Sequence, residues 1–272
     1  MVDAVGEIPT LGYFWAAILG AVQGLAEFLP ISSSGHLALV EHLGLGMAAP
    51  AVFDIFLHLA TLLVVLVYFR HTIVWYLRND FRVLLYVVMA SIPTAAIGFA
   101  FRKYFEAIRH SPTLICLGLL VTACILLMAE MRKAESLRLR DVGWFGAFVI
   151  GLCQALAITP GISRSGSTIA GAMLLGVERE EAFRFSFILS IPAVAGAALL
   201  SILSLVRAGG VDALFQGMEP GPLAVGFLVA AAMGFVSLAV LKRLVLRGGL
   251  VFFAVYCLFA ALAGFIYFNF VR

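Results

Sequence analysis

The sequence predicts an all-α polytopic membrane protein, a single domain of six transmembrane helices and two re-entrant helical hairpins in an inverted-topology repeat. The first observation behind this is composition: 63% of the 272 residues are hydrophobic and only 12% are charged. So little polar surface cannot cover a soluble globule of this size. The second is that the apolar runs are long and lack the period-two alternation of a membrane β-barrel. The third is an internal repeat.

Six apolar runs have the length of full spans, and each is bounded by charged residues or by Gly and Pro. A helix needs roughly 20 apolar residues to cross a hydrocarbon core of about 30 Å. Two further runs, 11–29 and 142–158, enter segments rich in Pro, Gly and Ser, so we expect half-spans that turn back inside the membrane. The six expected spans are 53–69, 83–101, 113–130, 183–205, 222–241 and 250–270.

The two half-spans are related copies at an offset of 131 residues. Eight of seventeen positions are identical, whereas this composition would give roughly one or two by chance. The chain therefore divides into a first repeat, 11–130, and a second, 142–270. Three crossings in each repeat would invert the second copy relative to the first. The matched residues are Gly20, Gln23, Leu25, Ala26, Ile31, Ser32, Ser34 and Gly35 with Gly151, Gln154, Leu156, Ala157, Ile162, Ser163, Ser165 and Gly166.

The basic residues predict the orientation of this repeat. Apart from Arg164, twelve Lys and Arg lie in one set of loops and five in the other. The richer set should face the cytoplasm, which leaves both termini outside. The first hairpin then enters from the outer face and the second from the inner face, and their tips can meet near the middle of the bilayer. Because these basic residues mark topology, the net charge of +3 does not indicate nucleic acid as a partner. The expected partners are membrane lipids.

The two hairpin tips carry residues suited to phosphate. Irregular backbone at membrane depth must line a cavity, and in both tips hydroxyls and Gly lead into a short helix whose free N–H groups and positive dipole end favour an anion. Arg164 adds a planar cation suited to bidentate phosphate contact. The residues expected to bind substrate are Gln23, Ser32, Ser34, Ser163, Ser165, Gly166 and Thr168.

Reacting groups are concentrated in the first tip. Glu27 follows Gln23 by four residues, so the two share a helix face and can act as base and orienter or as oxygen ligands to Mg²⁺ or Ca²⁺. His36 could donate a proton or attack phosphorus, and Ser33 could attack after activation by Glu27 or His36. Glu27, Ser33, His36 and Arg164 are the expected catalytic residues of a phosphoryl transfer. A purely structural Glu27–Arg164 ion pair is the alternative.

The segments from Gln23 to His36 and from Pro160 to Thr168 resemble the two signature motifs of the undecaprenyl pyrophosphate phosphatase family, also called the bacitracin-resistance type. The resemblance extends over the whole chain in length, span number and repeat. It implies hydrolysis of undecaprenyl diphosphate to undecaprenyl phosphate and inorganic phosphate, which recycles the lipid carrier of cell-wall synthesis. It also implies a divalent cation, a bacterial inner-membrane location and a site that opens to the outer face.

The resemblance assigns Glu27 and Gln23 to the acidic, metal-holding motif, His36 and Ser33 to the reacting groups, and the second tip to a phosphate cradle. Many relatives have Glu at the position of Gln23. An amide is a weaker ligand and no base, so Glu27 would carry more of this role here. A second lipid-phosphatase family has His at the position of Ala170 and is rejected.

The competing function and the oligomeric state remain open at this point. Inverted repeats with broken helices are the usual plan of transporters, so a polyprenyl-phosphate flippase is the competing function. The spans are rich in small residues, which is consistent with a homodimer.

Overall fold

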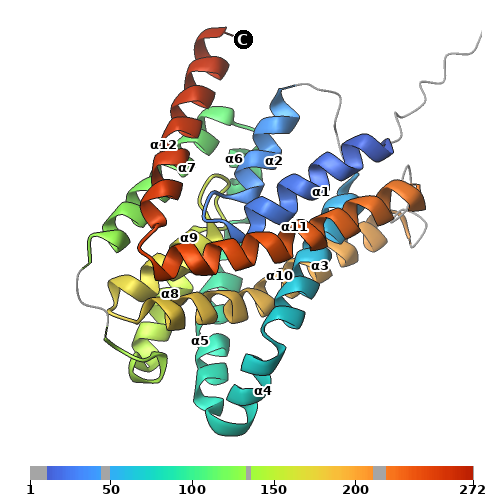
Figure 1. The fold of residues 1–272 in the computed structure, drawn as a ribbon. Helices are drawn as coiled ribbons and strands as arrows, with labels where there is room; N and C mark the ends of the chain where they lie inside the picture. Colours follow the sequence, from blue (N-terminus) through green and yellow to red (C-terminus); the bar gives the residue numbers. More distant parts are fainter. Residues whose placement is uncertain (1–10, 44–49, 133–135, 211–218, 272) are drawn as a thin grey trace, which may run out of the picture.

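The computed structural model describes residues 11–43, 50–132, 136–210 and 219–271 (Figure 1). These residues form helices and no strand. Six of the helices are long and apolar enough to cross a membrane, which confirms the six expected spans and makes the chain a multi-pass membrane protein. They are α3 (Ala51–Tyr68), α5 (Phe81–Ala100), α7 (Pro112–Glu130), α10 (Arg179–Gly209), α11 (Pro220–Leu246) and α12 (Leu250–Ile266).

Two pairs of shorter helices occupy the expected half-spans. The first pair is α1 (Tyr13–Phe28) and α2 (Ser33–His42), and the second is α8 (Gly143–Leu156) and α9 (Arg164–Leu174). With 16 and 14 residues, α1 and α8 rise only about 24 and 21 Å at 1.5 Å per residue. Each ends where its Pro-, Gly- and Ser-rich segment begins, as the sequence predicts.

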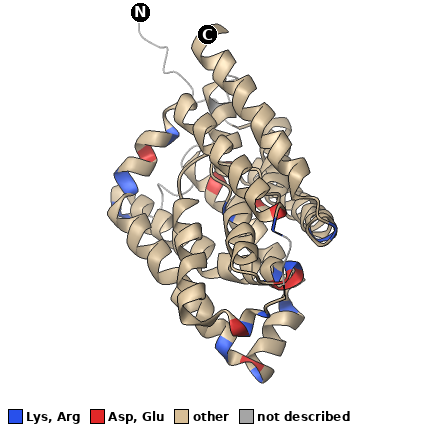
Figure 2. Cartoon of the chain, turned by 90° about the vertical axis from the view of Figure 1, so that its left-hand side faces the viewer, with Lys and Arg blue, Asp and Glu red and all other residues tan. Residues whose placement is uncertain are grey.

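Short elements connect the spans at their ends. Helix α4 (Arg70–Asn79) joins α3 to α5, and α6 (Arg102–Arg109) joins α5 to α7. A 3₁₀ turn, η1 (Leu139–Asp141), precedes α8, and a π-helical turn (Tyr267–Val271) follows α12. Figure 2 shows Lys, Arg, Asp and Glu gathered mainly on short helices and helix ends, with long stretches of uncharged ribbon between them. This is the charge distribution expected of a chain that crosses a bilayer.

The helices pack in pairs that follow the repeat. Equivalent spans lie against each other, α3 against α10 and α7 against α12. Helix α1 packs along α11, whereas its counterpart α8 packs along α5 (Figure 1). Equivalent glycines permit both contacts: a Cβ on Gly20 would lie 2.5 Å from the Gly226 carbonyl oxygen, and one on Gly151 would lie 2.3 Å from that of Ala90. Small residues thus bring these backbones together.

The tips of the two helix pairs touch each other beside α7. Gly161 has φ +93°, a left-handed conformation that glycine adopts without strain. A Cβ on Gly161 would stand 2.2 Å from the Ile115 carbonyl oxygen of α7, and one on Gly35 would stand 2.9 Å from the Gly161 Cα atom. Glycine is therefore required here both by conformation and by space, and the contact sets the distance between the tips.

Candidate active site

The first tip turns sharply between α1 and α2. Among the described residues, Ser32 is the only non-glycine residue with positive φ, at 69°, a conformation that costs of order 1–3 kcal/mol and is concentrated at functional sites. Its hydroxyl accepts a hydrogen bond of 3.3 Å from the Gly35 N–H, which caps the new helix. The turn leaves Glu27 near the end of α1 and Ser33 at the start of α2.

The second tip repeats this capping. Ser163 is the N-cap of α9, and its hydroxyl accepts a bond of 3.1 Å from the Gly166 N–H. The Ser163 N–H in turn donates to the Thr122 hydroxyl of α7 at 2.9 Å, so the tip is anchored to a spanning helix. Arg164 then opens α9 in the position that corresponds to Ser33 at the repeat offset.

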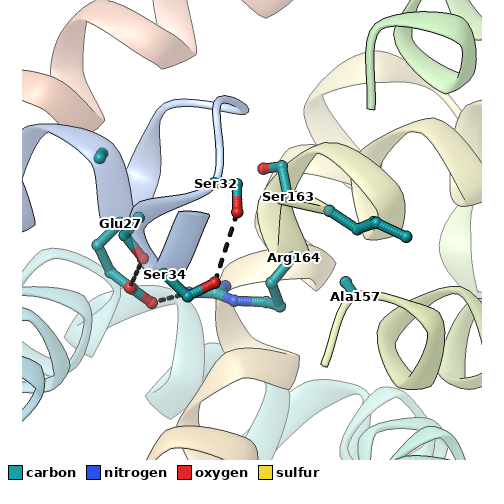
Figure 3. A pocket seen from close by; sticks show the side chains of 9 residues that line it. Glu27, Ser32, Ser34, Ala157, Ser163 and Arg164 are labelled. Carbon is teal, nitrogen blue, oxygen red and sulfur yellow. Dashed lines mark hydrogen bonds and ion pairs between the residues drawn. The ribbon is translucent and has the colours of Figure 1, made fainter. Parts of the chain in front are cut away.

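The carboxylate of Glu27 joins the two tips. Its Oε1 accepts a bond of 2.7 Å from Arg164 Nη2, and its Oε2 accepts one of 2.8 Å from the Ser33 hydroxyl and one of 3.1 Å from Gln23 Nε2. Figure 3 shows Glu27 and Arg164 reaching toward each other from opposite tips. The sequence predicts Glu27, Ser33 and Arg164 as catalytic residues. In the structure, Ser33 and Arg164 each contact the Glu27 carboxylate.

The Glu27–Arg164 ion pair is largely buried, and one nitrogen of its guanidinium lacks a hydrogen-bond partner among the described residues. The side chains of Glu27 and Arg164 are only 9% and 16% exposed, and a buried charge needs both a partner and filled hydrogen bonds. The Phe187 ring lies 5.7 Å from the guanidinium carbon. Arg164 Nη1, however, is buried without a hydrogen-bond partner in the described part of the chain. An anion beside Arg164 would supply the missing acceptor.

A small cavity of about 40 Å³ lies between the tips. That volume holds no more than a few water molecules, so a phosphoryl group requires the tips or Arg164 to shift. Both tips contribute side chains to its wall (Figure 3). The lining residues are Ala26, Glu27, Ser32, Ser33, Ser34, Ala157, Ile162, Ser163 and Arg164.

His36 is turned away from Ser33 and Glu27. Its Nδ1 lies 2.8 Å from the Ser32 carbonyl oxygen, and a carbonyl can only accept, so Nδ1 carries the proton. Its Nε2 lies 2.8 Å from the hydroxyl of Tyr256 on α12, and the two rings stack at 5.6 Å between centroids with 16° between planes. In the neutral imidazole Nε2 accepts a hydrogen bond from the Tyr256 hydroxyl, so both ring nitrogens have partners that leave Glu27 and the Ser33 hydroxyl untouched.

Gln23 connects Glu27 to His58 of α3. Its Nε2 donates to His58 Nδ1 at 2.7 Å, and His58 Nδ1 stands 3.7 Å from Glu27 Oε2. His58 thus supports this carboxylate network from a neighbouring span. Gln23 Oε1 is buried and accepts no hydrogen bond from any described residue. This oxygen has a free lone pair that a cation could use.

Three residues expected to cradle phosphate stand behind the second tip. Ser165, Gly166 and Thr168 are buried but do not line the cavity. The Thr168 hydroxyl lies 2.6 Å from that of Ser186 on α10, which ties α9 to this span. No group of three or more His, Cys, Asp and Glu that could hold a metal occurs among the residues that the structure describes. A cation at Glu27 would therefore need neutral oxygen ligands, such as Gln23, or oxygens of the substrate and water.

The sequence did not single out Thr122, Ser186 or Tyr256. Each meets its partner across a long stretch of chain: Tyr256 lies 220 residues from His36, and Thr122 lies 41 residues from Ser163. A lone hydroxyl in an apolar span gives no signal of such a contact. The repeat makes α7 and α12 equivalent spans, and this was the only sequence feature that linked them to the two tips.

Comparison with known proteins places the chain in a family. Residues 16–263 match the family described as bacitracin resistance protein BacA. Three relatives are called undecaprenyl-diphosphatase: those of Carboxydothermus hydrogenoformans (38% identity; 89% of this chain, 92% of the relative), Syntrophotalea carbinolica (41%; 91% and 95%) and Geobacter metallireducens (40%; 90% and 94%). Match length and identity agree with the motif resemblance. The chain belongs to the bacitracin resistance protein BacA family.

Proposed function

We propose that the chain hydrolyses undecaprenyl diphosphate to undecaprenyl phosphate and inorganic phosphate in the bacterial inner membrane, where this reaction recycles the lipid carrier of cell-wall synthesis. The observation that carries the proposal is the contact of Ser33 and Arg164 with one buried carboxylate, Glu27. A hydroxyl nucleophile, its base and a phosphate-binding cation at one point would be the machinery that such a reaction needs. The names of the relatives support the same substrate.

Ser33 is the nucleophile in this proposal. Its hydroxyl donates to Glu27 at 2.8 Å, within the reach that a general base requires. As Ser33 Oγ bonds to the terminal phosphorus, Glu27 takes the hydroxyl proton, and the bond from phosphorus to the bridging oxygen breaks. Glu27 passes the proton to the departing undecaprenyl phosphate. It then takes a proton from the water that attacks the phosphoserine and returns it to Ser33 Oγ as inorganic phosphate leaves.

Arg164 binds the terminal phosphoryl group. Its Nη1, which has no hydrogen-bond partner among the described residues, can donate to a phosphate oxygen while Nη2 donates to Glu27. The N-termini of α2 and α9, at Ser33 and Arg164, add backbone N–H groups and the positive ends of two helix dipoles. Ser32, Ser34 and Ser163 contribute hydroxyls on the cavity wall. These donors would stabilise the charge that develops on the phosphoryl oxygens.

A divalent cation, Mg²⁺ or Ca²⁺, is proposed as cofactor. Glu27 and the unpartnered Gln23 Oε1 are the ligands that this chain offers. Such a set is small, but Mg²⁺ is commonly held by one or two carboxylates together with substrate phosphates and water. When bound, the cation would neutralise phosphate charge. His58 fits the same arrangement as a positioning residue, because it holds the amide of Gln23 in place.

His36 and Tyr256 act as positioning residues. The Nδ1–H of His36 holds the Ser32 carbonyl, and so fixes the strained turn that presents Ser33, while Tyr256 holds the ring from the other side. Tyr256→Phe removes the donor to Nε2 and keeps the ring stack. A hydrogen bond of this kind contributes about 0.5–1.5 kcal/mol, so we expect kcat to fall by about 2- to 10-fold with KM nearly unchanged.

A double-mutant cycle checks the role of Tyr256. In a His36→Ala background, Tyr256→Phe should have no further effect on kcat, since its partner is gone. Tyr104→Phe, on an exposed ring of α6, is the matched control. An equal loss of kcat with and without His36 would contradict the positioning role.

The proposed topology is an inverted repeat with two re-entrant hairpins, both termini outside and a site reached from the outer face. It is supported by the pairing of equivalent spans, by the exchanged packing of α1 on α11 and α8 on α5, and by the basic residues of the loops. A homodimer stays a prediction from the small-residue spans. The competing flippase gains no support, because the relatives are named for hydrolysis and Ser33 is paired with a base.

Phosphate release by the purified protein tests the function. The protein in nanodiscs should release one phosphate per undecaprenyl diphosphate and none from undecaprenyl phosphate. Movement of labelled lipid phosphate across vesicles by Ser33→Ala, at the rate of the unchanged chain and without hydrolysis, would favour the flippase instead.

A further inference from the structure

A second cavity opens between α4 and the start of α10. Its volume is about 340 Å³, within the range of ligand pockets, about 300–1,000 Å³. Its walls carry polar and aromatic side chains that the proposed hydrolysis does not use. They are His71, Thr72, Trp75 and Tyr76 of α4 and Glu181 and Arg184 of α10.

One wall of this cavity holds a buried polar atom without a partner. The Tyr76 side chain is 4% exposed, and its hydroxyl has no hydrogen-bond partner among the described residues. Burial, reinforced by the nearby Glu181 carboxylate, raises the pKa of Tyr76 to about 12, so the phenol keeps its proton as a donor. A buried donor without a partner destabilises the folded state. A ligand oxygen would satisfy it.

The ion pairs at the cavity wall balance one another, and Asp80 adds a negative charge near Tyr76. Arg184 Nη2 lies 2.7 Å from Glu180 Oε1, which Lys242 also approaches at 3.3 Å, and Arg184 Nη1 lies 4.0 Å from Glu181 Oε1. Two cations and two carboxylates therefore cancel. A ligand with net negative charge gains nothing from such a set, whereas one that carries both signs can place its anion at Arg184 and its cation at Glu181.

The cavity lies where several spanning helices begin or end, which is where lipid headgroups are expected. It is formed where α3 ends at Tyr68, α5 begins at Phe81 and α10 begins at Arg179, and Figure 1 shows α4 at this end of the molecule. Beside it, α4 exposes the apolar side chains of Val74, Trp75 and Leu77. Half-exposed Trp at the end of spanning helices is typical of the membrane–water interface.

We infer that this cavity binds the headgroup of an amine-bearing phospholipid, a phosphoethanolamine attached to its diacylglycerol. The phosphate would accept hydrogen bonds from Arg184, Thr72 and Tyr76. The primary ammonium would donate hydrogen bonds to Glu181, which a quaternary choline headgroup cannot do, with the Trp75 ring beside it. The adjoining apolar side chains of α4 would meet the acyl chains.

Native mass spectrometry of the full chain tests this site. The protein, released from phosphatidylcholine nanodiscs containing equal small fractions of phosphatidylethanolamine and phosphatidylglycerol, should retain phosphatidylethanolamine over phosphatidylglycerol by about tenfold. Because a bound ligand stabilises the folded state, phosphatidylethanolamine should also raise the melting temperature. Tyr76→Phe, which removes only the unmet hydroxyl, should cut retention about 2- to 10-fold and abolish most of that rise. Tyr104→Phe should change neither.

Three outcomes would overturn the inference. The first is equal retention of the two lipids, and the second is retention of phosphatidylethanolamine that Tyr76→Phe leaves unchanged. The third is saturation of the site by soluble phosphoethanolamine without any preference among the lipids, which would assign the cavity to a free metabolite. Since Arg184 also pairs with Glu180, Arg184→Gln is a second variant: it should reduce retention even where its stability in phosphatidylcholine alone is lower.

Discussion

Arg164→Ala is expected to lower kcat/KM for undecaprenyl diphosphate by about 10³-fold or more, since a single preorganised donor to developing charge commonly contributes 10²–10³-fold. Arg164→Lys keeps the positive charge and loses the planar fork that contacts Glu27 through one nitrogen and leaves the other for phosphate. We expect the Lys variant to recover at most about a tenth of the lost activity. Phosphate release under subsaturating substrate measures both.

Loss of folding must be separated from loss of phosphate binding. Removing one partner of a buried ion pair can itself cost about 3–5 kcal/mol. Arg179 and Glu130 form a second pair of similar geometry, 3.0 Å between Nη2 and Oε1 and 19% and 14% exposed, outside the cavity wall. Glu130→Gln should lower the melting temperature with kcat/KM intact. If Arg164→Lys behaved like Glu130→Gln, the structural reading of the Glu27–Arg164 pair would be correct.

Glu27→Gln is expected to lower kcat by about 10²–10⁴-fold, the contribution of general acid–base catalysis. The amide keeps the size of the side chain and can still accept one bond from Arg164 or Ser33, but it cannot take the Ser33 proton. KM should change much less than kcat, because Arg164 remains to bind phosphate. Single-turnover phosphate release separates the two constants.

A change at Gln23 distinguishes whether Glu27 acts as a base or as a ligand to the cation. Gln23→Glu adds a carboxylate at the other end of the 3.1 Å contact with Glu27. In the Glu27→Gln background it should restore affinity for the cation without restoring kcat, since Ser33 contacts Glu27 and not Gln23. A Glu27→Gln variant with unchanged kcat would mean that Glu27 is not the base.

The spans were predictable because a bilayer imposes length and hydrophobicity on any helix that crosses it. The main difference lies at polar ends: α10 begins at Arg179 and ends at Gly209, beyond the apolar run 183–205. Hydropathy marks the membrane core, whereas backbone hydrogen bonds continue the helix into water. The helix breaks after Phe28 and Leu156 were also predictable, since Pro and Gly follow both apolar runs.

The candidate site was predictable in its members and less so in its contacts. Glu27, Ser33 and Arg164 stand out because ionisable and hydroxyl groups are costly in an apolar chain, and the structure brings these three together. The orientation of His36 toward Tyr256 depends on how α12 packs beside α2, which no local pattern encodes. For the same reason, the contact between Thr168 and Ser186 was not foreseen.

The repeat explains why the two tips differ in chemistry. At the repeat offset, Glu27 corresponds to Ile158, Ser33 to Arg164 and His36 to Ser167. The serine caps and glycines are kept in both copies, so each tip folds alike. Where the copies diverge, the first tip supplies the reacting groups and the second supplies the cation. One composite site thus arises from two similar turns.

The central claim is that Ser33 attacks phosphorus with Glu27 as its base. The most direct measurement is to quench the protein in acid during turnover of undecaprenyl diphosphate labelled in its terminal phosphate, and to map the label by mass spectrometry. The account predicts an acid-stable phosphoserine at Ser33 that is lost in Ser33→Ala and weak in Glu27→Gln. An acid-labile label on His36, unaffected by Ser33→Ala, would contradict it.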